Sequence, residues 1–224
     1  MTEVIEKQVE YAYDDLDDRA KERAMQWHAE CVRQNFGSED ASMHMDNARE
    51  DGEQFAACIE EVYLSEDSTS FDGYFNTYDF VNYLTNNKDG TVSAELQAQY
   101  GILLMLVDEG WVRTKIDFHS DGFSRHITKV SDFYPQLDEL FEGDRDVLKN
   151  GPLAGANVKQ LADSIGYGLL LDDMVERMTK KINELGDKTT KAVQADLDWL
   201  TSEDCFKECE YVNGWRFTKD GNIL

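Results

Sequence analysis

Basic residues are scarce in this chain. Only 22 Lys and Arg stand against 46 Asp and Glu, a formal net charge of −24 over 224 residues. Duplex DNA carries one charge per ~1.7 Å of its axis, so a charge of this size matches roughly 40 Å of duplex. A compact chain of this length has a similar extent. Nucleic acids and anionic membrane surfaces would be repelled, so we expect neither as a direct partner. The natural complement is a basic protein surface.

Familiar catalytic and cofactor motifs are also missing from the sequence. It has no CxxC pair, Walker loop, dinucleotide fingerprint, nucleophile elbow or zinc-ligand spacing. The cysteines lie in helical patterns and are expected as core thiols in a reducing compartment; they are Cys31, Cys58, Cys205 and Cys209. We therefore expect no cofactor, no metal ion and no enzymatic activity, and the oligomeric state is left open.

Long apolar runs are missing too. The longest, Gly101–Val107, is far too short to cross a bilayer, which takes about 20 residues. The opening residues MTEVIEKQVE lack the pattern of a signal peptide. We therefore expect the chain in the cytoplasm of a host cell. With only 2 prolines and 41% hydrophobic residues, the composition favours a folded core of regular elements over a linker.

Apolar residues at helical spacing predict two helices near the N-terminus. The first carries Leu16, Ala20, Ala24, Trp27 and Cys31 on one stripe. Asp17 is its expected N-cap, Asp18 lies in its first turn, and Gly37 is expected to stop it. A second helix is predicted over residues 42–59, with Met45, Ala48, Phe55 and Ile59 facing inward.

Two hairpins are predicted in the middle of the chain. Residues 62–64 and the aromatic-rich segment 71–80 form the first, with Phe71, Gly73, Phe75 and Thr77 on one face. Residues 111–118 and 125–130 form the second. Between the hairpins, Ser93 is expected to cap a helix, and because residues 101–107 are apolar all round, we expect it to be the most buried one.

The remainder of the chain is predicted to be mainly helical. A stripe from Leu171 to Leu185 should end at Gly186, a further helix should carry Val193 and Leu197, and Ser202 should cap a last one. This order of elements predicts an α+β fold, a small antiparallel sheet of hairpins covered by several helices. A break near residues 143–155 predicts an α+β domain over 1–145 and a mainly helical subdomain over 146–224.

Three short places in the chain carry a resemblance to known proteins. They are Tyr13–Leu16 with Ala20, Lys21 and Ala24; Ser70–Tyr74; and Leu200–Asp204 with Phe217–Gly221. Here the chain resembles a family of acidic phage and mobile-element proteins, whose members are sometimes labelled antitoxin-like. It departs from that family where Ser65–Ser70 lacks the glycines of a central turn and where the region around His126 lacks a His-Ser-Gly pattern. The resemblance implies a phage or mobile-element origin, and so a protein that acts on a host defence or nucleic-acid enzyme.

The acidic residues are concentrated toward the N-terminus. The first ninety residues hold 22 acidic and 7 basic side chains, a net charge of −15, which leaves −9 for the rest. Helix capping accounts for Asp17 and Asp18. The acids that remain are the candidates for contacting a partner: Asp14, Asp15, Glu22, Glu39, Asp40, Glu50, Asp51, Glu53, Glu60, Glu61, Glu66 and Asp67.

We interpret the chain as an inhibitor that binds the basic nucleic-acid-binding surface of a host defence protein. It would be an anti-restriction or anti-CRISPR DNA mimic that presents carboxylates where phosphates would lie. Two alternatives stay open. One is an antitoxin-like or assembly protein that binds a basic partner without mimicry. The other is a metal-dependent enzyme around one hairpin turn, with Asp117, His119, Asp121 and His126 as ligands. Of the other histidines, His28 is expected at the surface or at its boundary with the core, and His44 is isolated.

Overall fold

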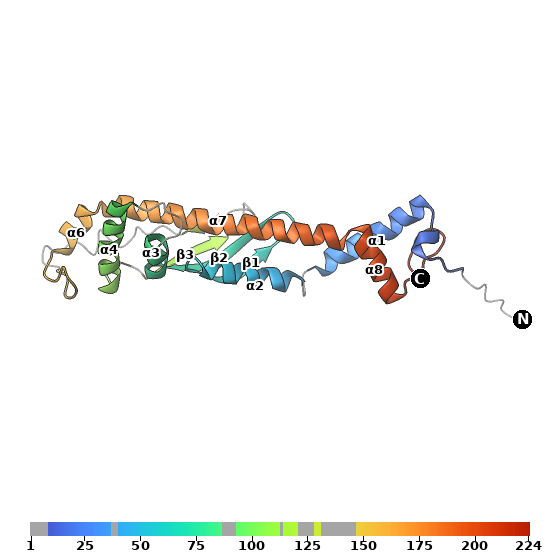
Figure 1. Cartoon of the computed structure of the whole chain (residues 1–224), viewed down its shortest axis with the longest axis horizontal. Coiled ribbons are helices and arrows are strands. Elements are labelled where there is room, and N and C mark those ends of the chain that lie inside the picture. Colours follow the sequence, from blue (N-terminus) through green and yellow to red (C-terminus); the bar gives the residue numbers. More distant parts are fainter. Residues whose placement is uncertain (1–8, 37–39, 87–92, 113, 121–127, 131–146) are drawn as a thin grey trace, which may run out of the picture. The chain divides into compact units, whose positions relative to one another are not determined.

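The computed structural model describes residues 9–36, 40–86, 93–112, 114–120, 128–130 and 147–224 (Figure 1). Its elements are η1 (Tyr13–Asp15), α1 (Asp18–Asn35), α2 (Asp40–Glu53), β1 (Ala57–Leu64), β2 (Thr69–Asn76), α3 (Thr77–Thr85), α4 (Ala94–Asp108), β3 (Lys115–Ser120), β4 (Thr128–Val130), α6 (Val158–Ser164), α7 (Tyr167–Leu200) and α8 (Glu203–Asn213). The protein is α+β with an antiparallel sheet, which confirms the predicted fold class. None of the described helices combines the length and the apolar character needed to span a bilayer.

The chain divides into two compact units. Unit 1 comprises residues 1–44 and 191–224, and unit 2 comprises residues 45–190. These limits differ from the predicted boundary at 145/146. The reason is that strands from the first predicted domain and helices from the second share a single core.

Unit 1 is built around α1 and the C-terminal residues. Its core contains Leu16, Ala20 and Ala24 from the predicted apolar stripe, packed with Tyr13, Phe206 and Phe217. The side chain of Asp17 accepts a hydrogen bond from the backbone N of Ala20, as expected for the N-cap of α1. Trp27 and Cys31, at the end of the stripe, are only half-buried.

The two histidines of unit 1 do not lie where the sequence placed them. His28 was expected at the surface or at its boundary with the core, but it is buried, only 4% exposed, and its Nε2 lies 2.9 Å from the carbonyl oxygen of Leu200. His44 was expected to be isolated, but it is 5% exposed and its Nε2 lies 2.8 Å from Asp196 Oδ2. Both expectations were wrong because the hydrogen-bond partners lie more than 150 residues away in the sequence, and no local sequence pattern predicts such a contact.

Unit 2 contains the sheet, in the order β1-β2-β3-β4 with each neighbouring pair antiparallel. The predicted alternation on β2 is confirmed, since Phe71, Gly73 and Phe75 are all buried; Thr77 is buried too, but as the first residue of α3. A Cβ at Gly73 would lie 2.1 Å from the carbonyl oxygen of Cys58, so the close approach of β1 requires glycine there. Figure 1 shows α7 alongside the sheet, and the apolar residues of both share one core.

The helix predicted to end at Gly186 continues to Leu200 as one element, α7. Glycine is tolerated there for a packing reason. A Cβ on Gly186 would lie 2.8 Å from the carbonyl oxygen of Thr69 on β2, so the missing side chain lets the helix approach the sheet. The predicted second helix on Val193 and Leu197 is therefore the continuation of α7.

Several other boundaries of helices and strands differ from the predicted ones. The helix predicted over 42–59 ends at Glu53, and Ile59 lies on β1. Ala56 makes the turn between them with a left-handed φ of 65°. The aromatic segment predicted as one strand over 71–80 becomes helical from Thr77, where Asn76 caps α3. The helix capped by Ser93 is not the most buried, because four of the nine residues of α3 are buried against four of fifteen in α4.

Candidate functional site

A long acidic segment lies in unit 2, between Asp46 and Asp79. It holds ten acidic residues and a single basic one, Arg49. The segment covers most of α2, the hairpin of β1 and β2, and the first turn of α3. A hydrogen-bonded helix and hairpin hold these carboxylates on a regular frame, which a solvated tail would not provide.

A bulge in β1 brings two of the predicted acids to the surface. The register of β1 against β2 shifts between Ile59 and Glu61. Because side chains alternate along a regular strand, consecutive residues normally point to opposite faces. Here Glu60 and Glu61 are both exposed, with buried Ile59 and Val62 on either side.

A tyrosine joins two carboxylates across the hairpin. The hydroxyl of Tyr63 lies within hydrogen-bond distance of Glu61 and of Asp72 Oδ2, the latter at 3.1 Å, so its single proton is shared between the two carboxylates. Glu61 also faces Asp72 in the β1–β2 register. The hydrogen bond to Glu61, followed by burial and by Asp72, raises the pKa of Tyr63 above its usual value. The hydroxyl thus stays protonated and offsets part of the repulsion between the two carboxylates.

The predicted acids of α2 differ in their surroundings. Glu50 and Glu53 are exposed. Asp51 was expected to be left for solvent or a partner, but its Oδ2 accepts a hydrogen bond of 2.6 Å from Lys188 Nζ on α7, and its side chain is 27% exposed. Asp51 is therefore partly neutralised within the fold. Glu66 and Asp67, also predicted, are exposed in the β1–β2 turn.

The remaining predicted acids belong to unit 1. Asp14 and Asp15 are exposed on η1, and Glu22 is exposed on α1. Asp14 Oδ1 lies 3.7 Å from Lys207 Nζ, which also lies 2.9 Å from Glu203 Oε1. Asp40 is the first residue of α2, and Glu39 lies outside the described residues.

The predicted metal-binding hairpin is only partly described. Asp117 and His119 are two residues apart on β3 and both exposed, so they share the outer face of the sheet. Asp121 and His126 lie outside the described residues. Within the described ranges, no group of three or more His, Cys, Asp or Glu side chains is placed to hold a metal ion.

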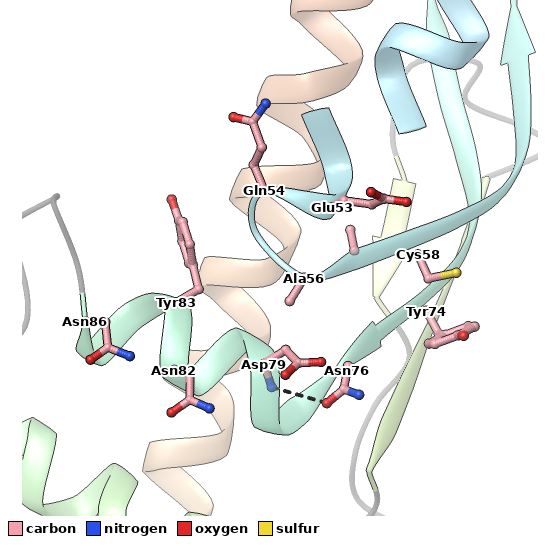
Figure 2. A pocket seen from close by; sticks show the side chains of 11 residues that line it. Glu53, Gln54, Ala56, Cys58, Tyr74, Asn76, Asp79, Asn82, Tyr83 and Asn86 are labelled. Atoms are coloured by element: carbon pink, nitrogen blue, oxygen red, sulfur yellow. Dashed lines mark hydrogen bonds between the residues drawn. The ribbon is translucent and has the colours of Figure 1, made fainter. Parts of the chain in front are cut away.

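A hollow of about 560 Å³ lies beside the acidic hairpin, and the sequence did not reveal it. Figure 2 shows its side chains around the space between the end of α2, the two strands and α3. We call it the polar hollow; its lining residues are Glu53, Gln54, Ala56, Ala57, Cys58, Tyr74, Asn76, Asp79, Asn82, Tyr83 and Asn86.

Two local features build the polar hollow. On α3, Asp79, Asn82, Tyr83 and Asn86 follow the spacing of one helical face, while Phe80, Val81 and Leu84 are buried on the other. This 3.6-residue period was the signal available in the sequence, and the strand prediction over 71–80 concealed it. At the opposite wall, the left-handed Ala56 turns the chain sharply from α2 into β1, and its carbonyl accepts a 3.2 Å hydrogen bond from Asn76 N.

Comparisons with protein-family models, with curated proteins and with solved structures found no match for this chain.

Proposed function

We propose that this protein is an inhibitor that binds the basic nucleic-acid-binding surface of a host defence protein, with its carboxylates in the positions of DNA phosphates. The observation that carries the proposal is the acidic segment 46–79, which holds ten acids and one basic residue on α2, the β1–β2 hairpin and the first turn of α3. Self-repulsion of this kind destabilises a folded chain, so a gain in binding is the reason we assign to it.

The rigid frame matters for this function. A phosphate-binding groove presents fixed lysines and arginines, and carboxylates already held by secondary structure lose little conformational freedom when they dock. Long-range attraction between opposite charges speeds association and weakens as salt is added. The exposed Glu60 and Glu61 on the bulge and Glu66 and Asp67 in the turn are the acids we assign to this contact.

The class of target follows from the resemblance to acidic phage and mobile-element proteins. Such elements meet restriction enzymes and CRISPR effectors in the host cell, and both bind DNA through basic grooves. The proposal therefore names a defence nuclease or effector as the target, without choosing between these two.

A test begins with capture of a host protein on the immobilised chain. The captured protein must bind DNA, lose that binding when the chain is added, and release the chain when excess duplex is supplied. In Glu60→Gln/Glu61→Gln, the affinity should fall by about tenfold. The control variant Glu95→Gln/Asp108→Asn removes the same charge from exposed positions on α4 and should lose about twofold or less. Binding that is indifferent to excess DNA would overturn mimicry.

A second candidate, a protein that binds a basic partner without imitating DNA, is favoured by an apolar feature of unit 1. Tyr211 and Val212, near the end of α8, are 89% and 79% exposed, and Trp199 is 56% exposed. Large exposed apolar side chains serve as anchors in protein interfaces. For this candidate, Tyr211→Ser/Val212→Ser should abolish capture, while excess DNA leaves it unchanged.

A further inference from the structure

We propose that the polar hollow receives an arginine side chain of the basic partner. This inference rests on the proposed function and deepens it, because it supplies a specific anchor where the acidic surface supplies only charge.

The charges of the hollow select a cation. Among the lining residues that the structure describes, Glu53 and Asp79 carry the carboxyl groups and none is basic. Phosphate or carboxylate groups would be repelled by these two acids and by the surrounding segment. A cationic group would be attracted both by these two acids and by the surrounding acidic segment.

The hydrogen-bonding groups favour a guanidinium among cations. Besides the two carboxylates, amide side chains line the hollow at Gln54, Asn82 and Asn86, and at Asn76, whose Oδ1 already accepts a hydrogen bond from Asp79 N. A guanidinium presents five N–H donors in a planar fork and can engage several acceptors at once, whereas an ammonium is a compact point charge. A wall rich in oxygen acceptors therefore suits arginine better than lysine.

The tyrosine rings of the hollow add a second contribution. Tyr74 and Tyr83 both line it, and the chain already places a cation over each ring: Lys115 Nζ lies 3.7 Å from the Tyr74 ring centroid, and Lys181 Nζ lies 5.7 Å from that of Tyr83. Aromatic faces attract cations, and a guanidinium also stacks on them. Lys115 thus competes with an incoming cation for Tyr74.

The size of the hollow fits a side chain carried by a peptide segment. A volume of about 560 Å³ lies within the range of about 300–1,000 Å³ typical of ligand sites. An arginine side chain leaves room for part of the backbone that carries it, so the occupant is a segment of the partner protein and not a free small cation.

The test uses the full chain and three synthetic peptides, each made of nine copies of one residue. The residues are arginine, lysine and citrulline, and citrulline is the neutral counterpart of arginine. The readout is alkylation of Cys58, which lines the hollow and is exposed. The arginine peptide should slow alkylation of Cys58 by about fivefold or more without changing that of Cys31 in unit 1. The lysine peptide should need a higher concentration to slow alkylation of Cys58 as much, and the citrulline peptide should have no effect.

Variants locate the binding. Glu53→Gln/Asp79→Asn should weaken the arginine peptide about tenfold, and Glu95→Gln/Asp108→Asn, with the same change of charge at exposed positions on α4, about twofold or less. Glu53→Gln alone leaves the first turn of α3 intact and should lose part of the affinity.

Lysine variants test the competition for Tyr74. Lys115→Gln should strengthen binding of the arginine peptide more than Lys129→Gln, which makes an equal charge change on β4. Equal losses in the two acidic pairs, or no protection of Cys58, would overturn the inference.

The outcome separates this inference from the proposed function. If Glu53→Gln/Asp79→Asn still inhibits the captured host protein at full strength, the hollow is not the anchor although the function stands. If the arginine peptide protects Cys58 but the host protein keeps its DNA binding, the hollow stands and the mimicry fails.

Discussion

His44 Nε2 lies 2.8 Å from Asp196 Oδ2, joining two residues 152 positions apart in the sequence. The histidine is almost fully buried, while the carboxylate is 43% exposed. A buried imidazole that loses its hydrogen-bond partner leaves a polar group unsatisfied, which costs about 1–3 kcal/mol. This contact ties the start of α2 to α7 within unit 1.

We predict that Asp196→Ala lowers the free energy of unfolding of unit 1 by about 1–3 kcal/mol. Asp198→Ala, an exposed acid two positions further along α7, should change it by less than about 0.5 kcal/mol. Urea unfolding followed by tryptophan fluorescence is a suitable measurement, because three of the four tryptophans, Trp27, Trp199 and Trp215, lie in unit 1. Equal effects of the two substitutions would show that the hydrogen bond to His44 contributes nothing.

Two helical glycines of unit 2 should respond to alanine in opposite directions. A Cβ on Gly186 would lie 2.8 Å from the Thr69 carbonyl oxygen, so Gly186→Ala should destabilise the protein by about 1–3 kcal/mol. At Gly101 on α4 a Cβ meets no atom within 4 Å, so Gly101→Ala should stabilise by about 0.5–1 kcal/mol through helix propensity. Thermal unfolding of both variants followed by circular dichroism checks the prediction, and a stabilised Gly186→Ala would contradict it.

Local signals allowed much of the fold to be predicted. Side chains of Asp17, Ser93 and Ser202 accept hydrogen bonds from the backbone three residues on, as their positions before apolar stripes indicated. The α+β class and the presence of two antiparallel hairpins were also correct. The strand limits were not, because β1 already begins at Ala57 and β3 covers Lys115–Ser120 where residues 111–118 were predicted.

Features that depend on tertiary contacts were not predictable. Gly186 reads as a helix stop until the strand behind it is known. The polar hollow needs the turn at Ala56 and the helix α3 together, and the aromatic run 71–80 concealed that helix. The candidate acids were found from charge alone, so the pairing of Asp51 with Lys188, 137 residues away, was missed.

The acidic hairpin should be a site of self-repulsion. Glu60 and Glu61 are adjacent and exposed, and Glu61 faces Asp72. We predict that Glu60→Gln raises the melting temperature in low salt, about 0.02 M, and has little effect at about 0.5 M, where screening is short-ranged. Glu61 is a poorer choice because it accepts the hydrogen bond of Tyr63. A salt-independent effect of Glu60→Gln would show that repulsion is not its cause.

Tyr100 should make the stability of unit 2 sensitive to alkali. Burial, followed by the charge of Asp173, raises its pKa above the usual 10.0, and its hydroxyl donates to Asp173 Oδ2 at 3.1 Å. The unfolded chain therefore loses this proton first. The contribution of Tyr100 is complete below pH 10.0 and declines as the pH rises above it toward the folded pKa.

Tyr100→Phe should therefore cost about 1 kcal/mol near neutral pH and progressively less above pH 10.0, by up to about 1.4 kcal/mol per pH unit. Because the difference from the wild type is measured at each pH, the titration of lysines cancels. Burial also raises the pKa of Tyr167, so the variant should retain some alkaline sensitivity. A constant difference across this pH range would contradict the assignment to Tyr100.

The four cysteines should react at different rates, contrary to the expectation that all are core thiols. Cys58 lies exposed on β1, Cys31 and Cys209 are half-buried, and Cys205 is buried. Burial, followed by the neighbouring Cys209, raises the pKa of Cys205 to about 11. With that pKa, only about one in a thousand Cys205 thiols is ionised near pH 8, and the thiolate is the reactive form.

Iodoacetamide should therefore modify Cys58 first and Cys205 last, as followed by peptide mass spectrometry. In denaturant all four rates should converge, because both the burial and the raised pKa depend on the fold. If Cys205 reacted as fast as Cys58 in the native protein, α8 would have to open on the timescale of labelling, and its packing in unit 1 would be weaker than its contacts imply.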